Sequence, residues 1–201
     1  MPSRPLVAWM DPLPFELTPA LRARRRSLAA IATGRVLDLG GWTDHLESYD
    51  DVDVDLLVIP DSRDGAGDPP RVRRLEVGVD ALLDLGVEPY DTIVSLIRMP
   101  LVADLPRFLA TVGALLVDDG RLLLLEPVNR ADTMGRVLAL WGPFVRATSG
   151  LHLDRDIATA VRDAGFHVTD LHRFRVQSVS APLRPFIEGQ ARLRLPRSSP
   201  S

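Results

Sequence analysis

The chain has 201 residues, which suits one domain with a sizeable core, and its 46% hydrophobic and 25% charged residues are ordinary for a globular protein. Its formal net charge of −3 gives no reason to expect nucleic acid or an anionic membrane as a partner. The absence of cysteine excludes a disulfide framework and a thiolate metal site, and the absence of lysine excludes a Schiff-base or P-loop lysine.

The sequence also predicts the cellular location of the protein. Its longest apolar runs are too short to span a bilayer, and its amino terminus lacks the continuous apolar stretch of a secretion signal. Together with the missing cysteine and an arginine-only composition typical of GC-rich bacteria, this predicts a bacterial, cytoplasmic protein without a membrane span. We expect residues 1–195 to form a single domain and residues 196–201 to be a disordered tail.

The first predicted element is a helix from Leu17 to Thr33. Thr18 suits its amino-terminal cap and Pro19 its first turn, and apolar residues recur at helical spacing before Gly34 ends it. The run of arginines within it is typical of a solvated helix face, and a nucleic-acid patch is the less favoured alternative.

Short apolar runs later in the chain predict buried strands. The elements expected are strands over 35–39, 54–59, 72–77, 92–97, 121–126, 166–176 and 185–195, and helices over 104–117, 133–145 and 153–164. Most of the strands are continuously apolar rather than alternating, which indicates that both faces of the sheet are covered. The sequence thus predicts an α/β fold with a doubly wound, mostly parallel sheet of seven strands, the last of them antiparallel.

The segment from Gly34 to Ile59 is the most informative about function. An apolar run ends in Asp38 and is followed by Gly40 and Gly41, the pattern of a buried strand that turns sharply into a helix. Such a turn lets backbone N–H groups approach a ligand at the carboxyl edge of an open α/β sheet. The pattern predicts a nucleotide-type cofactor site, although the G-x-G-x-x-G fingerprint of dinucleotide enzymes is missing.

Several segments carry a family resemblance when they are taken in order. They are VLDLG at 36–40, PYDTIVS at 89–95, LLVDDGRLLLLEPV at 115–128 and DAGFHVTDLHRFRV at 163–176. In this order the chain resembles the class I S-adenosylmethionine-dependent methyltransferases, which have a Rossmann-like fold. SGLHLDRD at 149–156 and LRPFIEGQAR at 183–192 are similar to a small bacterial branch of type 11-like enzymes related to thiol methyltransferases.

The resemblance implies a set of cofactor-binding residues. They are Asp38, Gly40, Gly41, Trp42, Thr43, Asp61, Asp80, Ser95 and Leu96. Asp80 would accept a hydrogen bond from the adenine amino group, and Ser95 and Leu96 would line the methyl-donating sulfur. Each role has a structural alternative, with Asp38 orienting a turn, Asp80 capping a helix and Ser95 satisfied at a strand end. No catalytic side chain is implied, because an activated sulfonium mainly requires an in-line acceptor and the exclusion of water.

The cofactor segment also departs from the family pattern. Trp42 and Asp44 stand where members of the family have glycine, so the loop or the ligand must shift. The acid that would hold the ribose hydroxyls is replaced by Ile59, with Asp61 as a candidate replacement and Asp55 as a weaker one. A degenerate cofactor site, with S-adenosylmethionine bound weakly or not at all, is therefore an open alternative.

A small hydrophobic acceptor would be bound by two segments of the chain. Residues 9–15 and 133–152 contribute an apolar and aromatic set that includes Trp141 and Phe144, and core packing explains these residues equally well. The histidines show no metal-ligand spacing, so no metal site is predicted. His45 and His152 could face the cleft as general bases, with a structural role as the more favoured alternative.

Two functions from different classes remain. The first is S-adenosylmethionine-dependent methyl transfer to a small, hydrophobic acceptor. The second is a catalytically silent relative that keeps the fold as a binding or dimerisation module, since a homodimer is compatible with the sequence.

Overall fold

The computed structural model of the chain describes residues 18–40, 45–50, 52–57, 68–128, 152, 155–177 and 184–193. The strands are β1 (Val36–Asp38), β2 (Val54–Leu57), β3 (Val72–Leu75), β4 (Tyr90–Leu96), β5 (Leu116–Pro127), β6 (Phe166–Arg175) and β7 (Pro185–Leu193). The α-helices are α1 (Pro19–Ala30), α2 (Val79–Asp84), α3 (Leu105–Leu115) and α5 (Ile157–Asp163). Two 3-10 helices, η2 (Leu46–Ser48) and η3 (Met99–Leu101), follow β1 and β4.

The seven strands form one sheet in the order β3-β2-β1-β4-β5-β7-β6. The strands β1 to β5 pair in parallel, whereas β7 runs antiparallel to both of its neighbours, β5 and β6. The predicted α/β, doubly wound and mostly parallel sheet with an antiparallel last strand is therefore confirmed. The order of the strands reverses between β1 and β4, and open α/β sheets bind their ligands beyond the carboxyl ends of the strands at such a point.

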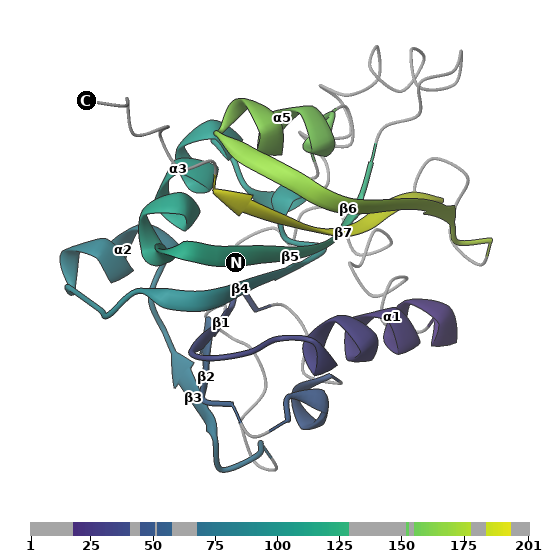
Figure 1. The fold of residues 1–201 in the computed structure, drawn as a ribbon. Coiled ribbons are helices and arrows are strands. Elements are labelled where there is room, and N and C mark those ends of the chain that lie inside the picture. Colours follow the sequence, from purple (N-terminus) through teal and green to yellow (C-terminus); the bar gives the residue numbers. More distant parts are fainter. Residues whose placement is uncertain are drawn as a thin grey trace, which may run out of the picture.

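Helices cover the sheet on both faces. Helix α1 lies on one side, and α2, α3 and α5 lie on the other (Figure 1). The apolar run Leu122–Leu125 of β5 is at most 1% exposed and alternates between the two cores. This explains why the strands read as continuous apolar segments.

The helix predicted over residues 104–117 is shorter in the structure. Asp104 caps α3 by accepting a hydrogen bond from the Arg107 N–H at 3.1 Å, but the helix ends at Leu115. Leu116 is extended and pairs with Tyr90, so the chain already belongs to β5 there, and Gly120 lies inside the strand. Pairing with β4 thus overrides the local helical pattern. Helix α2, which follows Gly78, was not predicted.

Some predicted elements lie outside the described residues. They are the helix over residues 133–145 and the tail over residues 196–201. None of the helices in the described part of the chain is both long and apolar enough to cross a bilayer.

Candidate functional site at the carboxyl edge of the sheet

Gly40 fixes the turn that follows the central strand β1. Its φ of +77° lies in the left-handed region, and a Cβ atom there would come within 1.8 Å of the Leu57 carbonyl oxygen at the end of β2. Only glycine avoids both the backbone strain and this collision. The prediction that Gly40 lies at the carboxyl end of a central strand is confirmed, because β1 pairs with β2 and β4.

The Asp38 carboxylate is the centre of a buried hydrogen-bond cluster beneath this turn. Its Oδ1 accepts from the Gly40 N–H at 2.8 Å, and its Oδ2 accepts from the Tyr49 hydroxyl at 2.8 Å. The same Oδ2 lies 2.5 Å from His45 Nε2. The three side chains are fully buried. Burial, followed by the charge of Asp38 and its hydrogen bond, raises the pKa of Tyr49 well above its usual value, so the phenol stays a donor.

This cluster supports structural roles for Asp38 and His45, whereas contact of Asp38 with a cofactor stays a prediction. Both oxygens of Asp38 bind donors from its own loop, as expected for a residue that orients a turn. His45 is 0% exposed and contacts Asp38, which supports the favoured structural role over that of a general base in the cleft. The sequence pattern could not reveal this, because Asp38 belongs to β1 and His45 caps η2, so their contact does not lie within a single helix or strand.

A second buried carboxylate, Glu126, lies at the carboxyl end of β5. The Ser95 hydroxyl of β4 donates to Glu126 Oε1 at 2.7 Å, and the Arg98 N–H donates to the same oxygen at 3.1 Å. The Met99 N–H lies 3.3 Å from Oε2. Burial raises the pKa of Glu126 from 4.5 to about 8, although these donors and the Arg98 charge act in the opposite direction. Glu126 is therefore mostly protonated at neutral pH.

Glu126 was not identified from the sequence, although a signal was present. An acid that closes the apolar run LLLLE stands at the carboxyl end of a strand, and fully buried glutamates are rare unless they have partners. Ser95 is fully buried against it, and Leu96 is 1% exposed. Their predicted place at the carboxyl end of β4 holds, whereas contact with a cofactor sulfur stays a prediction.

The turn after β4 has an unusual backbone. Ile97 adopts a φ of 57°, a conformation that is a genuine outlier for a β-branched residue. Arg98 follows in the right-handed region, and successive N–H groups in such an arrangement form a concave anion-binding nest. Here the N–H groups of Arg98 and Met99 hold the Glu126 carboxyl. Strain of this kind is typical of functional sites.

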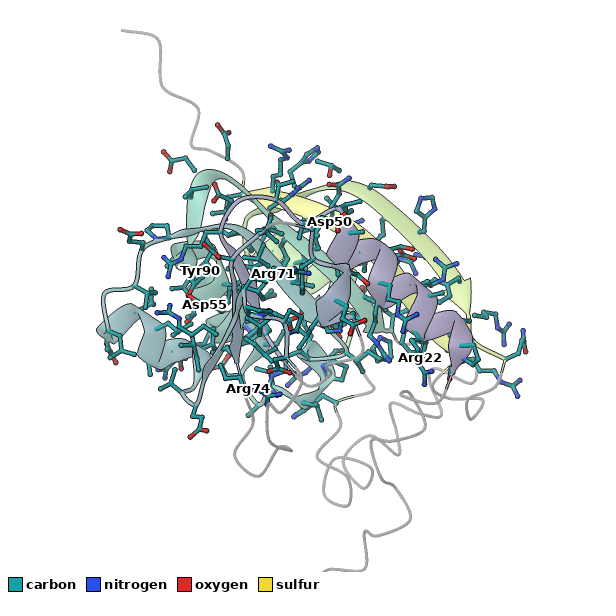
Figure 2. All side chains as sticks on the ribbon, turned by 90° about the horizontal axis from the view of Figure 1, so that it is seen from below. Arg22, Asp50, Asp55, Arg71, Arg74 and Tyr90 are labelled. Atoms are coloured by element: carbon teal, nitrogen blue, oxygen red, sulfur yellow. The ribbon has the colours of Figure 1, made fainter. Side chains whose placement is uncertain are left out.

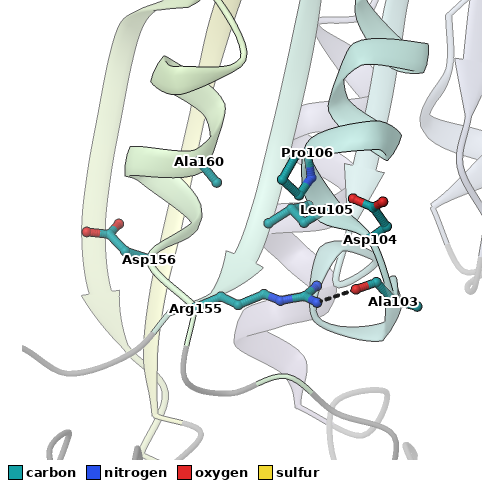
Figure 3. A pocket seen from close by; sticks show the side chains of 7 residues that line it. All are labelled: Ala103, Asp104, Leu105, Pro106, Arg155, Asp156 and Ala160. Carbon is teal, nitrogen blue, oxygen red and sulfur yellow. Dashed lines mark hydrogen bonds between the residues drawn. The ribbon is translucent and has the colours of Figure 1, made fainter.

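The other side of this turn is braced by the segment before α5. The Arg155 guanidinium donates to the carbonyls of Met99, Val102 and Ala103 at 3.3, 2.5 and 2.7 Å. Figure 3 shows the side chain reaching from the start of α5 to Ala103. The His152 N–H donates to the Pro100 carbonyl at 2.8 Å. His152 and Arg155 of the motif SGLHLDRD thus have a structural role that the sequence did not reveal, since they hold the β4–α3 connection in place.

A hollow of about 510 Å³ lies between the starts of α3 and α5 (Figure 3). Its charged side chains are Asp104, Arg155 and Asp156. Asp104 and Asp156 cap the two helices, and Arg155 binds the carbonyls of the β4–α3 connection. These side chains are therefore occupied by structural contacts, and we assign the hollow no ligand.

Asp80 connects two helices. It lies in the first turn of α2, its Oδ1 accepts from the Thr111 hydroxyl at 2.8 Å, and its Oδ2 lies 3.1 Å from an Arg107 nitrogen. The amino-terminal cap of α2 is Gly78, so Asp80 does not cap the helix. The carboxylate ties α2 to α3, and its role in adenine binding stays a prediction.

Asp55, the weaker candidate for the ribose, has a structural role in β2. Arg73 binds both of its oxygens at 2.7 and 2.8 Å, Arg35 lies 3.1 Å away, and the Tyr90 hydroxyl donates at 2.7 Å. Figure 2 shows Asp55 and Tyr90 close together. Burial would raise the pKa of Asp55, but hydrogen bonds from Arg73 and Tyr90 and the charges of Arg73 and Arg35 lower it below its usual value. Asp55 thus links β2 to Arg73 of β3, to Tyr90 of β4 and to Arg35, which precedes β1.

The remaining predicted site residues lie outside the described ranges. They are Gly41, Trp42, Thr43 and Asp61 of the cofactor site and Trp141 and Phe144 of the acceptor site. Within the described ranges, no group of three or more histidine or acidic residues is arranged to hold a metal ion.

The raised pKa of Glu126 predicts a specific pH dependence of stability. A carboxyl whose folded pKa exceeds its unfolded value contributes stability at low pH and loses that contribution as the pH rises through the folded pKa. Between pH 4.5 and about 8, the free energy of unfolding should therefore fall relative to a Glu126→Gln variant, by at most about 1.4 kcal/mol per pH unit. Urea unfolding of both proteins at several pH values measures the difference. Parallel stability curves would contradict the assignment.

S-adenosylmethionine is the cofactor implied by the sequence, and the chemistry of the donor set tests whether it fits. The left-handed Gly40 leaves β1 at its carboxyl end, where open α/β sheets bind ligands. The side chains of Asp38, Ser95 and Asp80 already bind partners within the protein. The described residues thus fit a cofactor held by backbone groups rather than by these side chains.

Comparisons with known proteins identify solved structures that have a similar fold. No protein-family model matches the chain, and no curated protein matches its sequence. An O-methyltransferase family protein from Burkholderia thailandensis has a similar structure, with a TM-score of 0.58 and 18% identity over 89% of this chain and 56% of that chain. A cyclopropane synthase from Mycobacterium tuberculosis gives a TM-score of 0.56 and 21% identity over 77% of this chain and 62% of that chain. This chain spans less than two thirds of the length of either structure. At these identities the likeness establishes that all three share an α/β, Rossmann-like fold.

Proposed function

We propose that this chain is an S-adenosylmethionine-dependent methyltransferase that acts on a small-molecule acceptor. The observation that carries the proposal is Gly40, a left-handed glycine at the carboxyl end of the central strand β1, beside the reversal of strand order. Ligands of open α/β sheets bind at this place. The fold that the chain shares with an O-methyltransferase family protein supports the choice of chemistry.

In this proposal, residues at the carboxyl edge of the sheet bind the cofactor and position the acceptor. The backbone of the turn after β1 holds the cofactor through Gly40 and the residues that follow it, Gly41, Trp42 and Thr43. Asp61 takes the ribose, and Leu96 lies next to the sulfur. When bound, S-adenosylmethionine supplies a methyl group that is already activated, so the protein only has to hold the acceptor in line and exclude water. The braced turn after β4 gives the acceptor a fixed wall, because Glu126 and Arg155 hold its backbone from two sides.

A second candidate is a catalytically silent relative that serves as a binding module. It is favoured by the observation that Asp38, Ser95 and Asp80 each bind partners inside the protein. In addition, the described part of the connection between β1 and β2 contains a 3-10 helix, η2, and no α-helix whose amino terminus would face an anionic group.

We expect the parent chain to bind S-adenosylmethionine weakly. Losing a hydrogen bond to a charged carboxylate at Ile59 should lower the affinity by roughly 10- to 150-fold. Trp42 and Asp44 should act in the same direction, so a variant with Trp42→Gly, Asp44→Gly and Ile59→Glu should bind more tightly. Calorimetry on both proteins measures the two affinities.

The same titration separates the two candidate functions. Saturable binding of S-adenosylmethionine and S-adenosylhomocysteine by the parent supports the methyltransferase. If neither ligand binds to the parent or to the triple variant while both proteins remain folded, the silent relative is the correct alternative. If the parent binds tightly and the variant gains nothing, then the loop holds the cofactor in another way and the expectation of weak binding is wrong.

A further inference from the structure

Arg98 is a partly buried arginine at the carboxyl edge of the sheet, two residues after the end of β4. Its backbone N–H is bound to Glu126. Within the described ranges of the chain, however, no acceptor atom takes a hydrogen bond from its guanidinium, and no carboxylate forms an ion pair with it. None of its side-chain nitrogen atoms is both buried and without a partner, so the guanidinium reaches solvent, where a ligand can meet it.

Other arginines in the protein show how unusual this is. Arg35 and Arg73 bind Asp55, Arg74 binds Asp68, and Arg155 binds three backbone carbonyls. Arg98 stands apart from these structural arginines. Its position beside the proposed acceptor site suggests that its partner is a ligand.

The Arg98 guanidinium is charged at neutral pH, and the neighbouring Glu126 carboxyl is mostly protonated there. Burial lowers the pKa of its guanidinium and the nearby Glu126 charge acts in the opposite direction, but an arginine stays protonated at neutral pH in any case. Glu126 has a pKa of about 8 and is mostly neutral there, and its oxygens already accept hydrogen bonds from Ser95, Arg98 and Met99. The backbone of Arg98 is fixed by the left-handed Ile97 and by Glu126. The site thus offers a cation on a fixed backbone, and its guanidinium forms no hydrogen bond with a carboxylate in the described part of the chain.

We propose that Arg98 binds the carboxylate of the methyl acceptor, so that the substrate is a small carboxylic acid. A guanidinium presents two parallel N–H donors that match the two oxygens of a carboxylate. The inference rests on the proposed function and adds one anionic group to the hydrophobic acceptor expected from the sequence. The same chemistry occurs in the methionine part of the cofactor, so the experiment must tell the two carboxylates apart.

The test compares matched acids and amides. Acetate, hexanoate and benzoate are titrated by calorimetry into the full chain, alone and with S-adenosylhomocysteine, beside their primary amides. At least one acid should bind and its amide should not. Arg98→Gln should weaken binding of that acid by about 10- to 150-fold. Arg98→Lys should retain part of the affinity, because it keeps the charge and loses the planar fork. Arg162→Gln, the same change at an exposed position of α5, should have no effect.

Each outcome decides a different part of the proposal. If acids and amides bind equally, if no acid binds, or if Arg98→Gln binds acids like the parent, then the assignment of Arg98 is wrong. If Arg98→Gln instead weakens S-adenosylhomocysteine and leaves the acids unchanged, then the carboxylate belongs to the cofactor and the acceptor assignment is overturned. If acids bind through Arg98 but S-adenosylhomocysteine never binds, then the carboxylate site stands and the proposed function fails. Unfolding midpoints of all variants show whether a loss of binding reflects a loss of folding.

Discussion

Gly40→Ala should destabilise the protein by more than about 4 kcal/mol or prevent it from folding, which is exceptional for a single substitution. Two effects combine at this position. A left-handed conformation costs a residue with a Cβ atom about 1–2 kcal/mol. The added Cβ would also lie 1.8 Å from the Leu57 carbonyl oxygen, so the turn after β1 or the end of β2 would have to move.

A matched control separates these effects. Gly165 also has a positive φ, of +90°, but a Cβ atom built there has no other atom within 4 Å. Gly165→Ala should therefore show only the backbone effect, about 1–2 kcal/mol. Urea unfolding of both variants gives the comparison. Equal losses would mean that the close approach of Gly40 to Leu57 is not a constraint on the native turn.

Asp38→Ala should also be strongly destabilising, by about 3–5 kcal/mol. The substitution removes the shared acceptor of the Gly40 N–H, His45 and Tyr49, all within the fully buried cluster. Buried donors left without an acceptor lose their hydrogen bonds without regaining those to water. The variant should therefore lose the structure of the turn after β1 together with its stability.

Tyr49→Phe provides the control for this cluster. It removes one donor to Asp38 and keeps the aromatic ring, so it should cost about 1 kcal/mol in the parent. In the Asp38→Ala background the same change should cost less, because the acceptor is already missing. Strictly additive losses in this double-mutant cycle would show that the two side chains do not act as a unit.

The mostly parallel sheet was predictable from the sequence because most of the strands are continuously apolar. The runs that form β1, β4 and β5 and the turn residue Gly40 were identified by local patterns, and the structure places them as expected. The boundary between α3 and β5 was missed, since the extended conformation of Leu116 depends on its pairing with Tyr90, 26 residues earlier in the chain.

The contacts of the site were harder to predict. Asp38 and Ser95 were correctly located at strand ends, but their partners His45, Tyr49 and Glu126 come from other turns and strands. Such contacts follow from register and loop packing, which a periodic pattern does not encode. The consequence for function is that Asp38 and Ser95 already bind partners within the scaffold, whereas their contact with a cofactor stays a prediction.

Hydrogen exchange with and without S-adenosylhomocysteine tests whether S-adenosylmethionine binds at the carboxyl edge of this sheet. We expect slower exchange in the turns after β1 and β4, over residues 39–50 and 97–103, and unchanged exchange in the hairpin of β6 and β7. Protection confined to that hairpin, or no change at saturating ligand, would contradict binding at this edge.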